Sequence, residues 1–358
     1  MHRKGKSIMN NAPLRIEQYE TVLFNANLNP KGIPESVTQA IKENISSIVK
    51  YPDIYYNKLK TAVSSYVGAP LENIVMGNGS TDLLKLYGAL LLPKKALLLT
   101  PGPSEFENVL SAYNVELSFY DLKEEDDFKL DMDDLISQLT DDLDLIIIAN
   151  PNNPTSKKIE LADIRKLTEA CKEKNIFLII DEMYIEFLDD YKEYTAVPLT
   201  EEFDNISVIR SVSKFFAVPG LRFAYAIMNN PEHKEIIDLT TTKNNIASLT
   251  AIAITDMFKD EEYITESQSM IHTERSLVYL AMSTSKTIKL IKPDANFMLV
   301  KLLKDDLSSS DVAMHCNQRG IIIRKCDDIR GLSDKFIRFC FMNPKQNDLM
   351  VNTILEIV

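Results

Sequence analysis

The chain has 358 residues, of which 45% are hydrophobic, and it carries a formal net charge of −12. This length exceeds the size at which one hydrophobic core stops growing, so one large and one smaller domain are expected. Acidic residues outnumber basic residues 52 to 40, which disfavours a nucleic-acid-binding surface.

The cysteine pattern and the N-terminus favour a cytoplasmic protein that holds no metal. The four cysteines lack C-x-x-C spacing and the four histidines are scattered, so no metal is expected and the thiols are expected to be reduced. The basic start MHRKGKSIMN is followed by a polar segment rather than by the apolar core of a secretory signal. No run reaches the length of a membrane span, so no membrane association is expected.

Helical periodicity alternates with short apolar runs from about residue 34 to residue 228, which is typical of a layered α/β domain. Helices are predicted over residues 36–48, 54–67, 80–91, 104–113 and 160–173. Buried strands, with helices on both faces of their sheet, are predicted over residues 95–99, 143–149, 176–180, 207–210 and 223–228. The rest is predicted to be helical to about residue 285, with strands over 297–301, 321–324 and 336–341 and a final helix, which suits a smaller α+β domain.

Small residues open the predicted helix 80–91. Gly79, Ser80 and Thr81 place free backbone N–H groups at a helix N-terminus, where a phosphate is favoured. The alternative is a turn with a Ser or Thr N-cap. There is no G-x-x-x-x-G-K-[ST] motif and no strand-linked G-x-G-x-x-G motif, so a nucleotide is not the favoured source of that phosphate.

Polar side chains follow two of the predicted strands. Asn153, in the segment Asn150-Pro151-Asn152-Asn153-Pro154, comes after the strand 143–149, at the strand end where ligands bind in α/β sheets. Asp181 ends the strand 176–180, where burial of a carboxylate is costly without a cationic partner. The alternatives are a loop stiffened by proline and an aspartate that caps the next helix.

The segment after strand 207–210 combines an amine with phosphate-binding groups. Apolar neighbours and a nearby cation favour a neutral, nucleophilic Lys214, as a Schiff-base lysine must be. Ser211 and Ser213 precede it, and Arg222 follows eight residues later. A hydroxyl and a permanently charged guanidinium are suited to a phosphate, whereas the alternative is a surface lysine after a strand.

In this order along the chain, these segments resemble the motifs of fold-type I pyridoxal-phosphate enzymes, the aspartate aminotransferase superfamily. The resemblance implies an aspartate-aminotransferase-like α/β fold, whose large cofactor-binding domain, over residues 34–235, has a mainly parallel seven-stranded sheet. A smaller α+β domain would cover residues 236–358, and residues 1–33 would form an N-terminal arm that packs with it. The family also implies a homodimer with shared active sites and a small-molecule substrate.

The resemblance assigns roles around pyridoxal 5'-phosphate. The catalytic residues would be Lys214, Asp181 at the pyridine nitrogen, and Tyr184, which would contact the phenolic oxygen beside Asn153. The phosphate would be bound by Gly79, Ser80, Thr81, Ser211, Ser213 and Arg222, and by Tyr51 of the neighbouring subunit. Pro103 stands where the family usually has a ring-stacking aromatic, and Phe106 is the nearby substitute.

The same resemblance assigns the substrate groups. Asn27 lies in the shared N-terminal asparagine motif, Arg338 matches the residue that binds the α-carboxylate, and Arg324 would take a second anion such as a substrate phosphate. The motifs are similar to two branches, threonine-phosphate decarboxylase of cobalamin biosynthesis and histidinol-phosphate aminotransferase of histidine biosynthesis. Leu28 and the run from Lys214 to Arg222 favour the decarboxylase. The aminotransferase and a catalytically silent binding homologue remain the alternatives.

Overall fold

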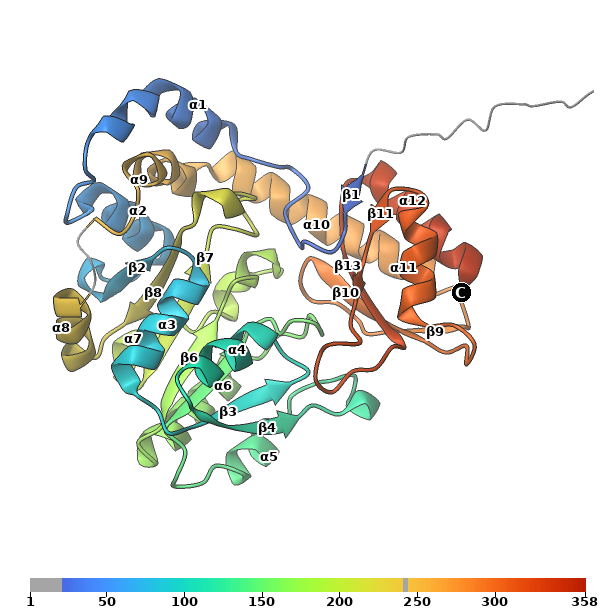
Figure 1. The fold of residues 1–358 in the computed structure, drawn as a ribbon, viewed down its shortest axis with the longest axis horizontal. Helices are drawn as coiled ribbons and strands as arrows, with labels where there is room; N and C mark the ends of the chain where they lie inside the picture. Colours follow the sequence, from blue (N-terminus) through green and yellow to red (C-terminus); the bar gives the residue numbers. More distant parts are fainter. Residues whose placement is uncertain (1–20, 241–243) are drawn as a thin grey trace, which may run out of the picture.

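The computed structural model describes residues 21–240 and 244–358. Within them lie a seven-stranded sheet, a four-stranded antiparallel sheet and a two-stranded pairing (Figure 1). Residues 1–20 of the predicted N-terminal arm lie outside the described residues, and the division into domains remains a prediction. No helix of the described part is long and apolar enough to cross a membrane.

The large sheet is mainly parallel, as predicted. Its strand order is β2-β8-β7-β6-β5-β3-β4, and only β8 runs antiparallel to its neighbours. The strands are β2 (Ile74–Gly77), β3 (Lys95–Thr100), β4 (Glu116–Asp121), β5 (Leu145–Ala149), β6 (Phe177–Asp181), β7 (Ile206–Ser211) and β8 (Ala224–Met228). The sequence did not predict β2 and β4, because β2 has four residues and β4 is an edge strand with only one fully buried residue.

Helices cover both faces of this sheet, and the apolar residues of one strand alternate between them. Leu98 packs in the hydrophobic cluster that includes residues of α3 (Ser80–Leu91) and α4 (Ser104–Ala112). Its neighbours Leu97 and Leu99 belong to the cluster that includes residues of α5 (Met132–Ser137) and α6 (Leu161–Glu173). This alternation explains why the strands read as continuous apolar runs.

Two helices preceding β2 are shorter than predicted. α1 (Glu35–Asn44) ends before the predicted residue 48 and continues as the 3-10 turn η1 (Ile45–Val49). α2 (Asn57–Val67) begins three residues late because Tyr56, its N-cap, has a left-handed backbone with φ of 49°. The predicted helices 80–91, 104–113 and 160–173 match α3, α4 and α6 to within one residue at each end.

The C-terminal part combines helices with the four-stranded sheet. The short helix α7 (Leu199–Glu202) precedes β7 and packs on β7 and β8 of the large sheet. The helices after β8 are α8 (Pro231–Thr240), α9 (Ser248–Thr255), α10 (Glu261–Met282), α11 (Ser309–Asn317) and α12 (Pro344–Ile357). The sheet order is β12 (Arg324–Lys325), β13 (Phe336–Cys340), β10 (Phe297–Leu302) and β9 (Ile288–Leu290). The predicted strand 321–324 is divided, because β11 (Ile321–Ile322) pairs instead with β1 (Val22–Leu23) near the N-terminus.

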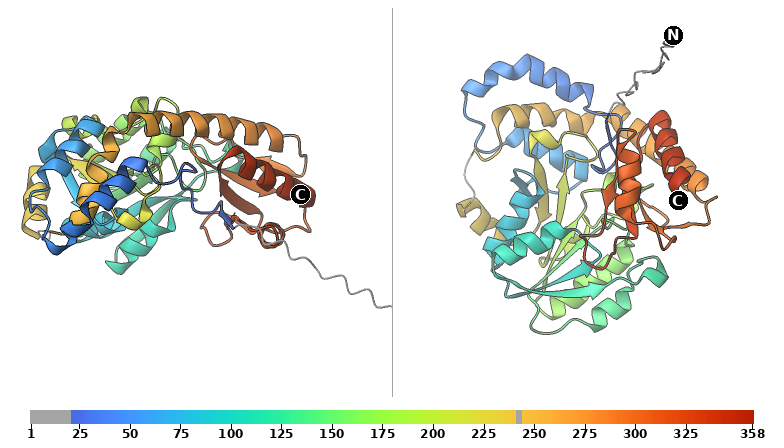
Figure 2. Two further views of the ribbon diagram at one scale, coloured as in Figure 1. Left: turned by 90° about the horizontal axis from the view of Figure 1, so that it is seen from above. Right: turned by 45° about the vertical axis from the view of Figure 1, so that its right-hand side comes forward.

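The 22-residue helix α10 contacts both α12 and the turn η4 (Ile185–Phe187) after β6, and it runs along both parts of the molecule (Figure 2).

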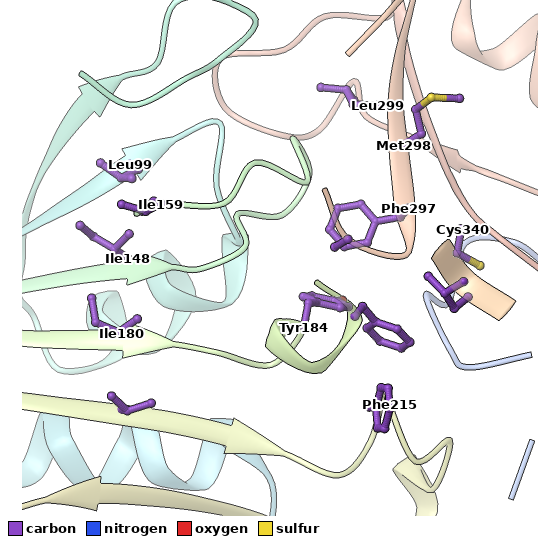
Figure 3. Close-up of a cluster of buried hydrophobic side chains, with 14 of the residues drawn as sticks. Leu99, Ile148, Ile159, Ile180, Tyr184, Phe215, Phe297, Met298, Leu299 and Cys340 are labelled. Atoms are coloured by element: carbon purple, nitrogen blue, oxygen red, sulfur yellow. The ribbon is translucent and has the colours of Figure 1, made fainter. Parts of the chain in front are cut away.

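The two sheets share a continuous hydrophobic cluster. Ile148 and Ile180 of the large sheet and Phe297 of the smaller sheet belong to it, with Tyr184 and Phe215 between them (Figure 3). Tyr184 packs edge-on against Phe297, with 4.9 Å between ring centroids. The carboxyl ends of the parallel strands therefore face the smaller sheet across a packed boundary, and the candidate site lies there.

Candidate functional site

Lys214 and Arg338 both contact the N-terminal segment. Lys214 Nζ donates a hydrogen bond of 2.9 Å to the backbone carbonyl of Ala26, and Arg338 Nη2 donates one of 2.9 Å to that of Asn25. Burial, followed by the charge of Arg338, lowers the pKa of Lys214. This is the direction that the sequence predicted for a nucleophilic amine.

The next residue of that segment reaches Tyr184. Asn27 is 1% exposed, and its Nδ2 donates to the Tyr184 hydroxyl at 3.3 Å. Burial raises the pKa of Tyr184, so the phenol keeps its proton at neutral pH. Asn27 Oδ1 is buried and has no hydrogen-bond partner within the described residues. Lys214, Arg338 and Tyr184, which are far apart in the sequence, thus all contact residues 25–27.

Asp181 is a buried carboxyl group at the end of β6. It is 7% exposed, and its Oδ1 accepts a hydrogen bond of 2.9 Å from the backbone N–H of Met183. Burial raises the pKa of Asp181 to about 7, and the charges of Glu105 and Glu182 act in the same direction. No ion pair joins Asp181 to a basic side chain in residues 21–240 and 244–358. The group is therefore suited to a cationic partner supplied by a ligand.

Arg338 links the smaller sheet to the loop after β5. Its Nη1 donates to Asn153 Oδ1, and its guanidinium lies over the ring of Phe297 at 5.5 Å. It is 7% exposed, and its Nε is buried with no hydrogen-bond partner in the part of the chain that the structure describes. A buried guanidinium with an unused donor is suited to an incoming carboxylate.

Gly79 and Arg222 form one side of a candidate phosphate cradle. Gly79 is the N-cap of α3, with φ of +95°, and no side chain caps the helix there. The alternative prediction of a Ser or Thr N-cap is therefore wrong. A Cβ atom at Gly79 would lie 2.5 Å from Arg222 Nη2, so the absence of a side chain brings this guanidinium to the free N–H groups of the helix. Ser80, 8% exposed, and Thr81 begin this helix.

The hydroxyls after β7 form a second group. Ser211 Oγ lies 2.8 Å from Ser213 Oγ and 3.3 Å from the carbonyl of Phe223, the residue that follows Arg222. Arg222 itself is exposed, and within residues 21–240 and 244–358 its guanidinium donates only to the Pro219 carbonyl, at 3.2 Å. Its guanidinium thus keeps donors for an anion.

Three predicted site residues form no hydrogen bond with the other candidate site residues within the described chain. Tyr51 is 89% exposed, in the loop before α2. Phe106 is 3% exposed and packs in the cluster under α3 and α4, so its assignment to ring stacking remains a prediction. Arg324 donates to Asp328 and to the carbonyl of Lys325.

Sequence reasoning missed two features beside the site. Glu105, in the first turn of α4, accepts a hydrogen bond from Thr81. Acidic residues are common in a first helical turn, so a glutamate at position 105 does not by itself indicate a functional role.

Arg210 is the second feature. It is 2% exposed, and it donates from Nε to Glu182 at 2.9 Å and from Nη2 to Thr195 at 2.7 Å. This buried ion pair joins the residue after Asp181 to the residue before Ser211. An arginine at the end of an apolar strand was the one feature of the sequence that could have indicated this pair.

Comparisons with known proteins agree with this geometry over most of the chain. The profile of the family "Aminotransferase class I and II" matches residues 19–354. The chain is 28% identical to the threonine-phosphate decarboxylase of Salmonella typhimurium, over 94% of this chain and 90% of that protein. It is 27% identical to the histidinol-phosphate aminotransferase of Methanococcus aeolicus, over 95% of this chain and 90% of that protein. The crystal structure of the histidinol-phosphate aminotransferase from Clostridium acetobutylicum is similar with a TM-score of 0.87 and 31% identity, over 94% of this chain and 98% of that chain.

Proposed function

The chain belongs to the aminotransferase class I and II family, whose members use pyridoxal phosphate, and we propose that it decarboxylates a phosphorylated amino acid of the threonine O-phosphate type in the cytoplasm. The observation that carries this proposal is the convergence of the Lys214 amine and the Arg338 guanidinium on adjacent carbonyls of one N-terminal segment. This places a base and a carboxylate-binding group beside each other. Leu28 and the motif from Lys214 to Arg222 support the decarboxylase branch.

The residues present fit the cofactor. Asp181 is buried without a cationic partner in the described chain, and a protonated pyridine nitrogen is such a partner. Gly79 and Arg222 offer helix N–H groups and a guanidinium to a phosphate. Lys214 would hold the aldehyde carbon. When bound, the cofactor supplies an electron sink that stabilises negative charge on the substrate Cα.

The protein side chains would then decide which bond breaks. Arg338 would bind the substrate carboxylate and fix its direction relative to Lys214. If the carboxylate is held in the direction of cleavage, carbon dioxide leaves and Lys214 returns a proton to Cα. If the Cα–H bond is held there instead, Lys214 removes that proton and the outcome is transamination.

Transamination of histidinol phosphate is the second candidate. The similarity to the Clostridium acetobutylicum structure at 31% identity favours it. Histidinol phosphate has no carboxylate, so Arg338 would bind its phosphate in one half-reaction and a carboxylate of 2-oxoglutarate in the other. A catalytically silent homologue is disfavoured because Lys214 and Arg338 contact adjacent carbonyls and Asp181 is buried without a basic partner in the described chain.

We propose a homodimer as the catalytic unit. The segment around Tyr51 exposes an apolar surface, made of Ile48 at 64%, Val49 at 84%, Tyr51 at 89% and Tyr55 at 64% exposure. Covering this surface with a second copy would remove it from water. The same contact would carry Tyr51 to the phosphate cradle of the partner.

Product analysis tests the proposed reaction. The cofactor-loaded protein is incubated with O-phospho-L-threonine, and released carbon dioxide is measured. A parallel reaction contains histidinol phosphate and 2-oxoglutarate, and glutamate is measured. Carbon dioxide without glutamate supports decarboxylation, glutamate without carbon dioxide supports transamination, and neither product contradicts both candidates.

A further inference from the structure

Arg324 and Arg338 lie directly opposite each other on the antiparallel strands β12 and β13. Side chains of directly opposed residues project from the same face of a sheet, so the two arginine side chains start from neighbouring positions. Their environments differ. Arg338 is buried and directed to Asn153, whereas the side chain of Arg324 is 34% exposed and donates from Nη2 to Asp328 Oδ2 at 2.8 Å.

The loop that carries Asp328 is fixed to the large sheet. Thr100 Oγ1 donates to the Arg330 carbonyl at 2.7 Å, and the Arg330 guanidinium pairs with Glu107 at 2.9 Å and lies 4.0 Å from the ring centroid of Phe119. Asp328 is thereby held at a defined distance from Arg324, and the hydrogen bond from Arg324 lowers the pKa of this carboxyl. Asp328 is charged at neutral pH.

A cavity of about 380 Å³ lies on the other side of this loop. Asp328 lines it together with Pro103, Ser104 and Arg330. The Asp328 side chain is 64% exposed, so it has solvent-accessible space into which it can turn when Arg324 releases it. The ion pair can therefore open without displacement of the backbone.

We propose that Asp328 sets the affinity of Arg324 for the distal anion of a substrate, because it occupies Arg324 until that anion takes its place. The inference rests on the proposed function, because it takes Arg338 as the partner of the substrate carboxylate. With Asp328 in place, the two arginines and one carboxylate carry a net charge of about +1, which a single substrate carboxylate neutralises. A distal phosphate carries about −1.5 to −2 charges and three acceptor oxygens, so it can displace one carboxylate from Arg324. A neutral distal group leaves the ion pair intact, so Asp328 weakens the binding only of ligands that carry a distal anion.

The test compares ligands that differ only in the distal anion. Dissociation constants for O-phospho-L-threonine and L-threonine are taken from the rapid change in cofactor absorbance on mixing with the loaded protein at low salt. Exposed ion pairs contribute about 0.2–1 kcal/mol, so Asp328→Asn should strengthen binding of the phosphorylated ligand by about 1.4-fold to fivefold. Binding of L-threonine should not change.

Asp327→Asn is the matched control. It removes the same charge from the neighbouring position, where the carboxylate faces Lys325 Nζ at 3.7 Å and acts on Arg324 only through its charge. It should strengthen binding of the phosphorylated ligand less than Asp328→Asn does, and it should leave binding of L-threonine unchanged. In an Arg324→Ala background, Asp328→Asn should also have no effect, since the group that Asp328 occupies is gone.

Equal effects of the two Asp→Asn substitutions, or equal affinity of the unchanged protein for both ligands, would overturn the proposal. Because binding is measured apart from turnover, the role of Asp328 and the proposed decarboxylation can be contradicted separately. A protein that shows the predicted dependence on Asp328 and releases no carbon dioxide contradicts only the proposed reaction.

Discussion

The amine of Lys214 donates a hydrogen bond of 2.9 Å to the carbonyl of Ala26, 188 positions earlier in the chain. The contact joins the loop after β7 to the segment that also binds Arg338 and Tyr184. A carbonyl accepts from either a neutral amine or an ammonium, so it does not oppose loss of the proton, which burial and Arg338 favour. The hydrogen bond thus holds the Lys214 amine in position, and the lowered pKa favours its neutral, nucleophilic form.

Replacement of Lys214 by alanine should abolish the covalent attachment of the cofactor and lower kcat by at least about 10²-fold to 10⁴-fold, the usual contribution of a positioned acid–base group. The visible absorbance of the lysine-bound cofactor and the turnover rate are the measurements. Lys157→Ala, at another partly buried lysine with a lowered pKa, is the control and should retain both. Unchanged turnover in Lys214→Ala would support the silent homologue.

Replacement of Asp181 by asparagine should change the pH dependence of stability in the cofactor-free protein. The pKa of Asp181 is raised from 3.8 to about 7, so the folded protein retains a proton that the unfolded chain releases. Stability should therefore decrease as pH rises from about 4 to about 7, by up to on the order of 4 kcal/mol, and the loss should be complete above pH 7. Asp181→Asn removes this titration.

Thermal unfolding at pH 4 and pH 8 checks this prediction. Asp181→Asn should unfold at a higher temperature than the unchanged protein at pH 8, and the difference should shrink at pH 4. In the loaded protein, Asp181→Asn should instead weaken cofactor binding. A difference in unfolding temperature that is the same at both pH values would contradict the assignment of the proton to Asp181.

Replacement of Gly79 by alanine should weaken cofactor binding. The added methyl group would meet Arg222 Nη2 at 2.5 Å and displace the guanidinium from the N-terminus of α3. Gly68→Ala is the control, because Gly68 also has a positive φ, of +75°, and no atom lies within 4 Å of the added methyl group. Both changes should destabilise the protein by about 1–2 kcal/mol. Only Gly79→Ala should raise the dissociation constant for pyridoxal phosphate, and equal constants for the two variants would contradict the cradle.

Replacement of Glu182 by glutamine should be strongly destabilising. It leaves the buried charge of Arg210 without its closest carboxylate partner, and breaking such a pair costs about 3–5 kcal/mol. Glu202→Gln, which breaks the exposed pair with Arg165, should be far less destabilising, because solvent screens an exposed pair. Urea denaturation of both variants measures the free energy of unfolding, and similar values for the two would show that burial does not set the cost.

Sequence reasoning predicted the family and the mainly parallel sheet because strand ends, turn residues and the lysine motif each leave a local pattern. Lys214, Asp181, Asn153 and Arg338 were assigned by resemblance, and the structure brings them together. Sequence reasoning could not predict that Arg324 binds Asp328. An arginine at a strand end has the same local pattern whether it binds a substrate anion or a neighbouring carboxylate. Contacts between distant segments, such as that of β1 with β11 or of Thr81 with Glu105, also leave no periodicity in either partner.

Reduction of the loaded protein with borohydride, followed by peptide mass spectrometry, tests the central claim most directly. An imine between a lysine and pyridoxal phosphate is fixed by reduction as a stable secondary amine. The account predicts that one peptide, the one containing Lys214, gains the mass of the reduced cofactor. Modification of a different lysine, or no modification in protein saturated with pyridoxal phosphate, would contradict it.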